Sequence, residues 1–414
     1  MDSITRRKFL VTSGVTGAGA LAAGMTAYSV NDILATAGER TETTGPDSKT
    51  LVMITLYGGN DSLNMIVPFA DSAYHDARPE LAYKDTEVLK VSDSVGLNPA
   101  MKGMHRLYGE KRMAIVRSVG YPKADRSHFR SMDIWHTANP NQPGNTGWLG
   151  RWLDTVGGDP RMAVSFETVL PPLLAGALSA GAVVGQNGVR LPKNLPLKTV
   201  SALGQAAAGE SILQARAAAC FADLANVDTF IRDVRENDEA QAGQAQARAT
   251  GTGGGSALNN QLSLVAQCIE AKVATRAFSV SLGGFDTHAD EKAPHQGLLG
   301  ILDRSVTAFL DRVSKTEQGK NVVVAIYSEF GRRVRANASD GTDHGAAADV
   351  MLLGHSLNGG LYGEAPNLKK LDDGDVKYST DFRDIYATLS EKVLNADPAR
   401  VVDGWKGRLN GLFA

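Results

Sequence analysis

Short apolar runs alternate along the chain with segments in which apolar residues recur at helical spacing. The run Val-Val-Val-Ala-Ile-Tyr at 322–327 is apolar throughout, which is typical of a strand covered on both faces of a sheet. Similar runs occur at 51–57, 113–119, 277–282 and 350–353. We therefore predict five strands of one buried sheet.

Helices are predicted between these runs. An apolar stripe at steps of three and four residues predicts an amphipathic helix through Leu298, Leu302, Val306, Phe309 and Val313. Segment 382–394 predicts a closing helix, with Thr380 or Asp381 as its N-cap. Strands that alternate with helices indicate an α/β fold in which the sheet is mainly parallel.

The middle of the chain has a different pattern. Residues 204–250 are rich in Ala, Gln, Arg and Glu and show no strand pattern, so they predict one or two helices. The Gly-rich segment 251–256 predicts a flexible joint, and a further helix is expected at 262–273. We expect a helical insertion at about 204–256 within a single sheet domain.

The start of the chain has the order of features of an export signal. The arginine pair Arg6-Arg7 precedes an uncharged stretch at 11–30, and Ala35-Thr36-Ala37 supplies a small-x-small cleavage site. The stretch is rich in glycine and too weakly apolar for a permanent membrane span. An uncleaved anchor and a chance basic start are the alternatives.

We therefore predict that residues 1–37 are a twin-arginine signal peptide and that residues 38–414 form the mature domain. The expected partner of the signal is the twin-arginine translocase, and the expected location is the periplasm or the outside of the cell. No apolar run after residue 38 is long enough to span a bilayer, so no stable span is expected after cleavage.

Charge and cysteine content narrow the class of protein. The chain has 43 Lys and Arg against 45 Asp and Glu, a net charge of -2, which argues against a nucleic-acid partner. Its two cysteines, Cys220 and Cys268, are too few for a disulfide scaffold. They could form one bridge or remain two buried thiols.

Polar clusters follow the predicted strands. They occupy 57–62, 126–130, 283–288, 328–333 and 341–345. Open parallel sheets place their binding sites at the carboxyl ends of the strands, so these clusters are expected to meet. Carboxylates and imidazoles from separate strand ends predict a divalent metal site, with zinc, manganese or iron favoured over calcium.

Individual residues in these clusters suggest roles. Asp286 and His288 are two apart, so both can point the same way in an extended loop and share one ion. Ser127 is expected at a helix start, where unpaired N–H groups favour an anion. The histidines at positions 75, 105, 136, 295 and 355 are expected to be structural. The chain has no G-x-S-x-G, G-x-x-x-x-G-K-[ST], H-E-x-x-H or G-x-G-x-x-G motif.

Six motifs together resemble a large twin-arginine-exported family of unknown function that is allied to the alkaline phosphatase and sulfatase superfamily. They are Gly-Gly-Asn-Asp at 58–61, Arg-Ser-His-Phe-Arg-Ser-Met-Asp-Ile-Trp at 126–135, Gly-Trp-Leu-Gly-Arg at 147–151, Gly-Gly-Phe-Asp-Thr-His at 283–288, Ser-Glu-Phe-Gly-Arg at 328–332 and Gly-Thr-Asp-His-Gly at 341–345. The resemblance implies an alkaline-phosphatase-like three-layer sandwich with a mainly parallel sheet.

The resemblance also implies residue roles. The implied metal ligands are Asp61, Asp286, His288, Glu329, Asp343 and His344. Ser127 would be the nucleophile, and His128 could assist it or join the metal site. Phe330 stands where the superfamily has a histidine ligand, so one of two expected metal sites lacks an imidazole.

These expectations predict an exported metal-dependent hydrolase of phosphate or sulfate esters. The metal would be zinc or manganese, in a number that the sequence leaves open. The anionic group of a small ester substrate would be held by Arg126, Arg130 and Arg332, because guanidinium matches tetrahedral oxyanions. The alternative is a catalytically degenerate, metal-binding accessory or binding protein of the cell envelope, which Phe330 favours.

Export is predicted to depend on Arg6 and Arg7. Changing both to Lys should leave full-length precursor in the cytoplasm, because the pair is the part of the signal that the translocase reads. Immunoblots of cytoplasmic and periplasmic fractions measure this. Normal periplasmic delivery of the Lys-Lys variant would contradict the prediction.

Overall fold

The computed structural model describes residues 33–34, 36–37, 48–184 and 255–413. Nearly all of the predicted signal peptide, nearly all of the predicted helical insertion and Cys220 lie outside these residues. Cys268 is described, and it is a buried free thiol.

A nine-stranded sheet forms the centre of the described chain, in the order β13-β5-β12-β9-β1-β8-β6-β7, with β14 paired to β5. Strands β1, β8 and β9 are parallel neighbours, and β12 runs antiparallel to both β9 and β5. The strands are β1 Thr50–Tyr57, β5 Met113–Gly120, β6 Ala163–Ser165, β7 Ala182–Val183, β8 Ala277–Gly283, β9 Val322–Ser328, β12 Ala348–Gly354, β13 Gly360–Tyr362 and β14 Thr380–Asp381.

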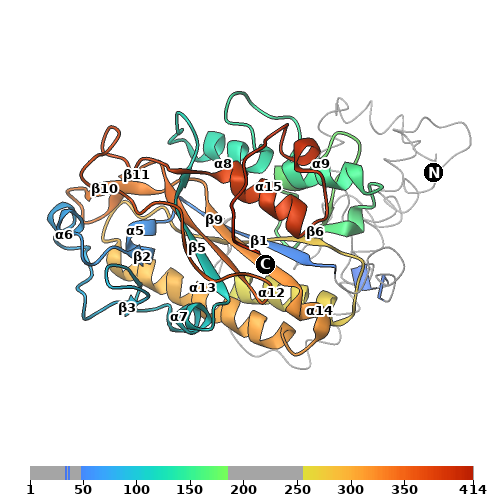
Figure 1. Cartoon of the computed structure of the whole chain (residues 1–414), viewed down its shortest axis with the longest axis horizontal. Helices are drawn as coiled ribbons and strands as arrows, with labels where there is room; N and C mark the ends of the chain where they lie inside the picture. Colours follow the sequence, from blue (N-terminus) through green and yellow to red (C-terminus); the bar gives the residue numbers. More distant parts are fainter. Residues whose placement is uncertain (1–32, 35, 38–47, 185–254, 414) are drawn as a thin grey trace, which may run out of the picture.

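Helices cover both faces of this sheet, which makes three layers (Figure 1). One face packs against α7 Lys102–Gly109, α12 Gly255–Glu270 and α13 Lys292–Val313. The other packs against α8 His128–Thr137, α9 Trp148–Thr155, α15 Phe382–Lys392 and α16 Pro398–Val401. Alternate residues of β1 enter the two cores: Val52 and Ile54 enter one, and Leu51 and Met53 the other.

Shorter elements complete the fold. They are α5 Ser62–Met65, β2 Ile66–Val67, α6 Ser72–Ala77, β3 Leu89–Lys90, β4 Gly96–Leu97, η1 Pro160–Met162, η2 Pro172–Leu174, α14 Glu317–Lys320, β10 Arg332–Ala336 and β11 Thr342–His344. Strands β10 and β11 form an antiparallel hairpin that follows β9 along the chain. In Figure 1 this hairpin lies at one end of the sheet, near α5 and α6.

The expected α/β class with a mainly parallel sheet is confirmed, and the structure corrects three details. The predicted strand at 350–353 is β12, which is antiparallel. Helix α13 begins at Lys292, earlier than the apolar stripe predicted. Pro294 permits this start, because it falls in the first turn of the helix, where a missing N–H costs no hydrogen bond. Helix α12 likewise begins at 255, inside the predicted joint.

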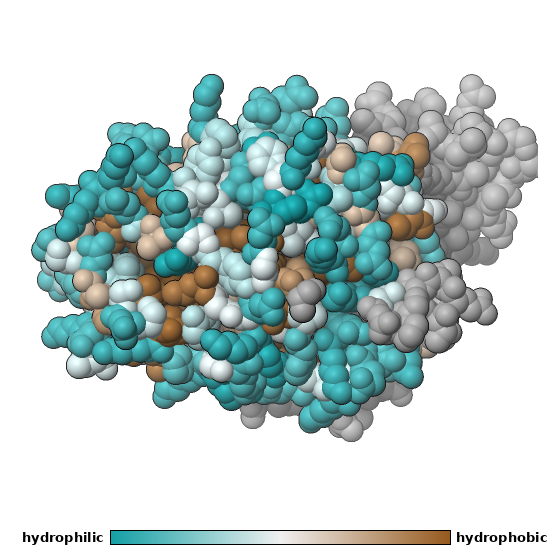
Figure 2. All heavy atoms as spheres, viewed as in Figure 1, coloured by the Kyte–Doolittle hydropathy of each residue, from teal (hydrophilic) through white to brown (hydrophobic). Residues whose placement is uncertain are grey.

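The closing helix α15 has Asp381 as its N-cap, and the Asp381 side chain accepts a hydrogen bond from the Arg383 N–H. On the face seen in Figure 2, hydrophilic residues cover most of the surface, and hydrophobic residues show in patches between them. Among the described residues, no helix combines the length and the apolar character that a bilayer span requires.

Candidate metal centre

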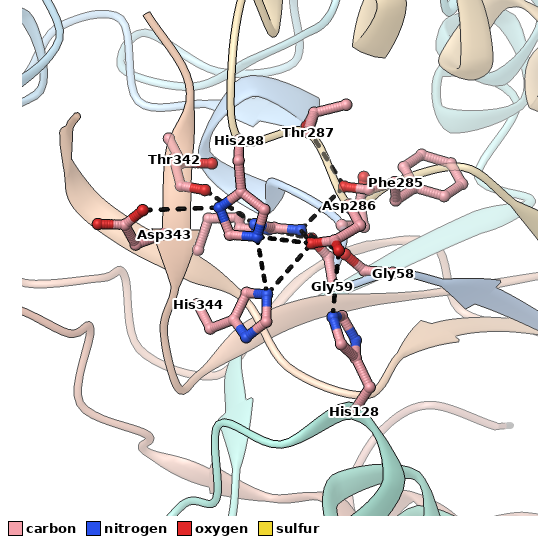
Figure 3. Close-up of polar contacts among 12 residues, drawn as sticks. Gly58, Gly59, His128, Phe285, Asp286, Thr287, His288, Thr342, Asp343 and His344 are labelled. Atoms are coloured by element: carbon pink, nitrogen blue, oxygen red, sulfur yellow. Dashed lines mark hydrogen bonds and ion pairs between the residues drawn. The ribbon is translucent and has the colours of Figure 1, made fainter. Parts of the chain in front are cut away.

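Three histidines and one aspartate meet at the carboxyl edge of the sheet (Figure 3). Asp286 and His288 lie in the loop after β8, His344 ends β11, and His128 is the first residue of α8. The Nε2 atoms of His288 and His344 lie 2.9 and 3.1 Å from Asp286 Oδ1, and His128 Nε2 lies 3.5 Å from Asp286 Oδ2.

The other ring nitrogen of each histidine is directed at an oxygen. His344 Nδ1 donates to the carbonyl of Arg126 at 2.9 Å, and His128 Nδ1 lies 2.9 Å from Glu329 Oε1. His288 Nδ1 lies 3.6 Å from Asp343 Oδ1. With each Nδ1 facing an oxygen on the outside, each Nε2 atom is turned toward Asp286; metal-ligating histidines are oriented in the same way, through their other ring nitrogen.

The spacing of these atoms fits a metal ion. His288 Nε2 and His344 Nε2 are 3.1 Å apart, and ligands about 2.0–2.1 Å from a tetrahedral zinc are separated by roughly 3.3 Å. Ligand atoms of His128, Asp286 and His344 all lie within 4.8 Å of one another. His128 Nε2 is buried and has no hydrogen-bond partner among the described residues.

The centre is open to solvent on one side. The side chains of Asp286 and His288 are 47% and 45% exposed, whereas Glu329 is almost fully buried. A metal centre of the catalytic kind keeps a coordination position free for water or substrate, and such exposure leaves room for it.

The acids of the centre are held in their ionised form. Burial raises the pKa of Asp286, but hydrogen bonds from Arg332 and His344 outweigh it and lower the pKa to about 2. Burial likewise opposes ionisation of Glu329, and hydrogen bonds from His128, the Gly58 N–H and Ser328 lower its pKa. The hydrogen bond to Glu329 in turn raises the pKa of His128.

Arg332 joins the loops that carry the centre. Its buried guanidinium donates to Asp286 Oδ1 at 2.7 Å and to four backbone carbonyls, those of Gly58, Gly59, Phe285 and Thr342. All three guanidinium nitrogens are therefore in use, with Nη2 facing three of the five oxygens, and the structure places Arg332 among the protein's own oxygens, where we had expected it to hold a substrate anion.

The other expected anion-binding arginines also have partners. Arg126 pairs with Asp373 and Asp375, and Arg130 pairs with Asp133 on its own helix. Ser127 is the N-cap of α8, as expected, and it is exposed, but its side chain makes no capping hydrogen bond.

Two acids that we expected to bind the metal lie one step outside the group of three histidines and Asp286. Glu329 and Asp343 contact the outer nitrogens of His128 and His288 and so orient these rings. Asp61, also expected as a ligand, is fully buried and pairs with the guanidinium of Arg78 at 2.5 Å.

Phe330 lies against the centre from the inside. Its ring centroid is 4.9 Å from that of His128 and 4.7 Å from that of His344, and the side chain is almost fully buried. The adjacent Gly59 has a φ of 69°, and a Cβ atom there would lie 2.2 Å from Phe330 Cε2. Phe330 thus packs two histidine rings in place.

A buried network that the sequence did not predict lies behind the centre. Arg78, Glu291 and His295 are buried, and the His295 Nε2–H donates to Asn60 Oδ1 at 2.9 Å. Glu291 lies between Asp290 and Lys292, a charged run typical of a solvated surface, so nothing in the sequence pointed to its burial. Burial and the charge of Asp61 raise the pKa of Glu291 to about 9.

The family model described as "Protein of unknown function (DUF1501)" matches residues 48–413, so the chain belongs to the DUF1501 family. This confirms the expected membership in a family of unknown function, while twin-arginine export stays a prediction. No curated protein sequence matches the chain significantly.

Several solved structures are similar to this one at 10% sequence identity. A protein in the alkaline phosphatase superfamily from Vibrio parahaemolyticus has a TM-score of 0.42 over 87% of this chain and 69% of that chain. Murine ectonucleotide pyrophosphatase/phosphodiesterase 5 has a TM-score of 0.40 over 85% and 96%. A sulfatase described as putative from Bacteroides thetaiotaomicron has a TM-score of 0.33 over 88% and 76%.

The packing of Phe330 predicts a large stability difference between two phenylalanines. Phe330→Ala should lower the free energy of unfolding by about 3–5 kcal/mol, because it leaves a cavity against two histidine rings. Phe129, which is 92% exposed, provides the matched control, and Phe129→Ala should change stability by roughly 0.5 kcal/mol or less. Urea denaturation measures both, and equal effects would show that Phe330 is not a core residue.

Proposed function

We propose that this protein is an exported metal-dependent hydrolase of phosphate or sulfate esters, with one divalent ion held by His128, Asp286, His288 and His344. The observation that supports it is the convergence of three Nε2 atoms on one carboxylate while each Nδ1 faces an oxygen. Zinc and manganese both suit this set of imidazole and carboxylate ligands.

The bound ion would supply Lewis-acid polarisation of a phosphoryl or sulfuryl oxygen. The chain itself supplies orientation: Glu329, Asp343 and the Arg126 carbonyl fix the three rings, and Arg332 keeps Asp286 ionised. These contacts are present before any substrate arrives, so the centre is preorganised.

The start of α8 is the surface best suited to the anionic group. The first N–H groups of a helix have no partner within it and favour negative charge, and His128 opens this ten-residue helix beside the centre. The exposed hydroxyl of Ser127, one residue earlier, is the candidate nucleophile. This role replaces the expected binding of the anion by Arg126, Arg130 and Arg332, whose partners are internal.

A metal-binding envelope protein without catalysis is the second candidate. It is favoured by one observation: Asp61, the expected ligand of a further ion, is neutralised by Arg78. A chain that binds one ion and hydrolyses no ester would support this candidate.

Metal content and activity should depend together on His288. We expect purified protein loaded with zinc or manganese to hold about one ion per chain. It should hydrolyse at least one of three chromogenic esters: p-nitrophenyl phosphate, a p-nitrophenyl phosphate diester or p-nitrophenyl sulfate. His288→Ala removes a ligand and should lower bound metal, melting temperature and activity together, because a ligated ion stabilises the folded state. Elemental analysis, calorimetry and a chromogenic assay measure the three quantities.

His355→Ala is the matched control, since His355 is exposed and lies beyond the end of β12 that faces away from the centre. It should retain both metal and activity. Unchanged metal content in His288→Ala would exclude His288 from the centre, and full loading without hydrolysis of any of the three esters would favour the binding protein.

A further inference from the structure

A second group of acidic and basic side chains lies behind the metal centre and is closed to solvent. Asp61, which follows β1, Arg78, which follows α6, and Glu291, which precedes α13, are each 0% exposed. Fully buried ionisable groups are rare unless they are paired, so this group requires an explanation of its own.

The group forms a cage of oxygen atoms around a guanidinium. Arg78 donates to Asp61 Oδ2 at 2.5 Å and to the carbonyl oxygens of Val334 and Arg333, each at 2.8 Å. Two further carboxyl oxygens, Asp61 Oδ1 and Glu291 Oε1, are buried and have no N–H donor among the described residues; the side chains of Asp61 and Glu291 share a hydrogen bond, for which Glu291 supplies the proton. We call these residues, Asp61, Arg78, Glu291, Arg333 and Val334, the oxygen cage.

The donor atoms of the oxygen cage are of the kind that hard cations prefer. Apart from Arg78, the cage offers only carboxyl and carbonyl oxygens, the ligands typical of calcium and magnesium. The open centre offers mainly imidazole nitrogen, so the two groups differ in the ion that each would select.

We infer that the oxygen cage is a cation site whose cation is the guanidinium of Arg78, which limits the protein to the single metal ion of the open centre. The charges agree with this: Asp61 and Arg78 are both ionised and balance each other, and burial together with the Asp61 charge keeps a proton on Glu291 at neutral pH. The inference rests on the proposed metal centre only for the count of one ion.

The oxygen cage also supports the loops of the open centre. Glu291 Oε2 accepts the hydroxyl hydrogen bond of Thr342 at 2.6 Å, and Thr342 lies two residues before His344. Arg78 holds the carbonyl of Arg333, the neighbour of Arg332, which binds Asp286. Loss of the internal cation should therefore loosen the open centre as well as the cage.

Arg78→Ala is the direct test, with calcium as the probe because its oxygen ligands match the cage. Wild-type protein should bind no calcium in the cage, whereas Arg78→Ala should bind about one calcium ion per chain. The variant should melt at a lower temperature than wild type, and calcium or methylguanidinium should recover part of the loss, because each replaces the missing charge. Isothermal titration and calorimetry measure these effects without substrate, so the result does not depend on hydrolase activity.

A double variant is the matched control. Arg78→Ala with Asp61→Asn removes the cation and the carboxylate together, so it should melt above the single variant and bind no calcium. If Arg78→Ala cannot be isolated folded, a folded double variant still supports the inference, since only the lone carboxylate requires a cation. Three results would overturn it: calcium binding by wild type that Asp61→Asn abolishes, a folded Arg78→Ala that neither cation stabilises, and equal failure of the single and double variants.

Discussion

The open centre depends on the hydrogen bonds that the buried guanidinium of Arg332 donates. Four carbonyl oxygens, from the loops after β1 and β8 and from β11, accept hydrogen bonds from this side chain, and that of Phe285 also accepts one from the Thr287 N–H. An unsatisfied buried polar group costs about 1–3 kcal/mol, so a single residue offsets such costs in several segments at once. The same group holds Asp286, and so the chain geometry and the ligand geometry are determined together.

The centre is prepared by contacts outside the ligands. Glu329 is held by the Gly58 N–H and by Ser328 while it contacts His128, and its own carbonyl accepts hydrogen bonds from Ser131 and Trp135. Phe330 then restricts the rings of His128 and His344 from the core side. Little reorganisation would accompany ion binding, because the entropy of ordering these rings is already lost on folding.

The sequence was sufficient to predict the main strands and the loops that carry the site. Apolar runs marked β1, β8 and β9, and the rule that parallel strands end at one edge brought Asp286, His288 and His344 together. The sequence could not distinguish a carboxylate that would bind a metal from one that orients a histidine. Glu329 and Asp343 could take either role from the same positions in the sequence. The burial of Arg78 and Glu291 comes from contacts between distant segments, which local pattern does not encode.

The reversed direction of β12 has a consequence for how the site is assembled. Because β9 ends and β12 begins at the same edge of the sheet, the connection between them never has to cross to the opposite edge, as a parallel neighbour would require. One uninterrupted segment, 329–347, therefore contributes Glu329, Phe330, Arg332, Asp343 and His344. Sequence changes confined to this segment could therefore alter one proposed ligand, the packing of two histidine rings and the charge of Arg332 together while the sheet beneath stays the same.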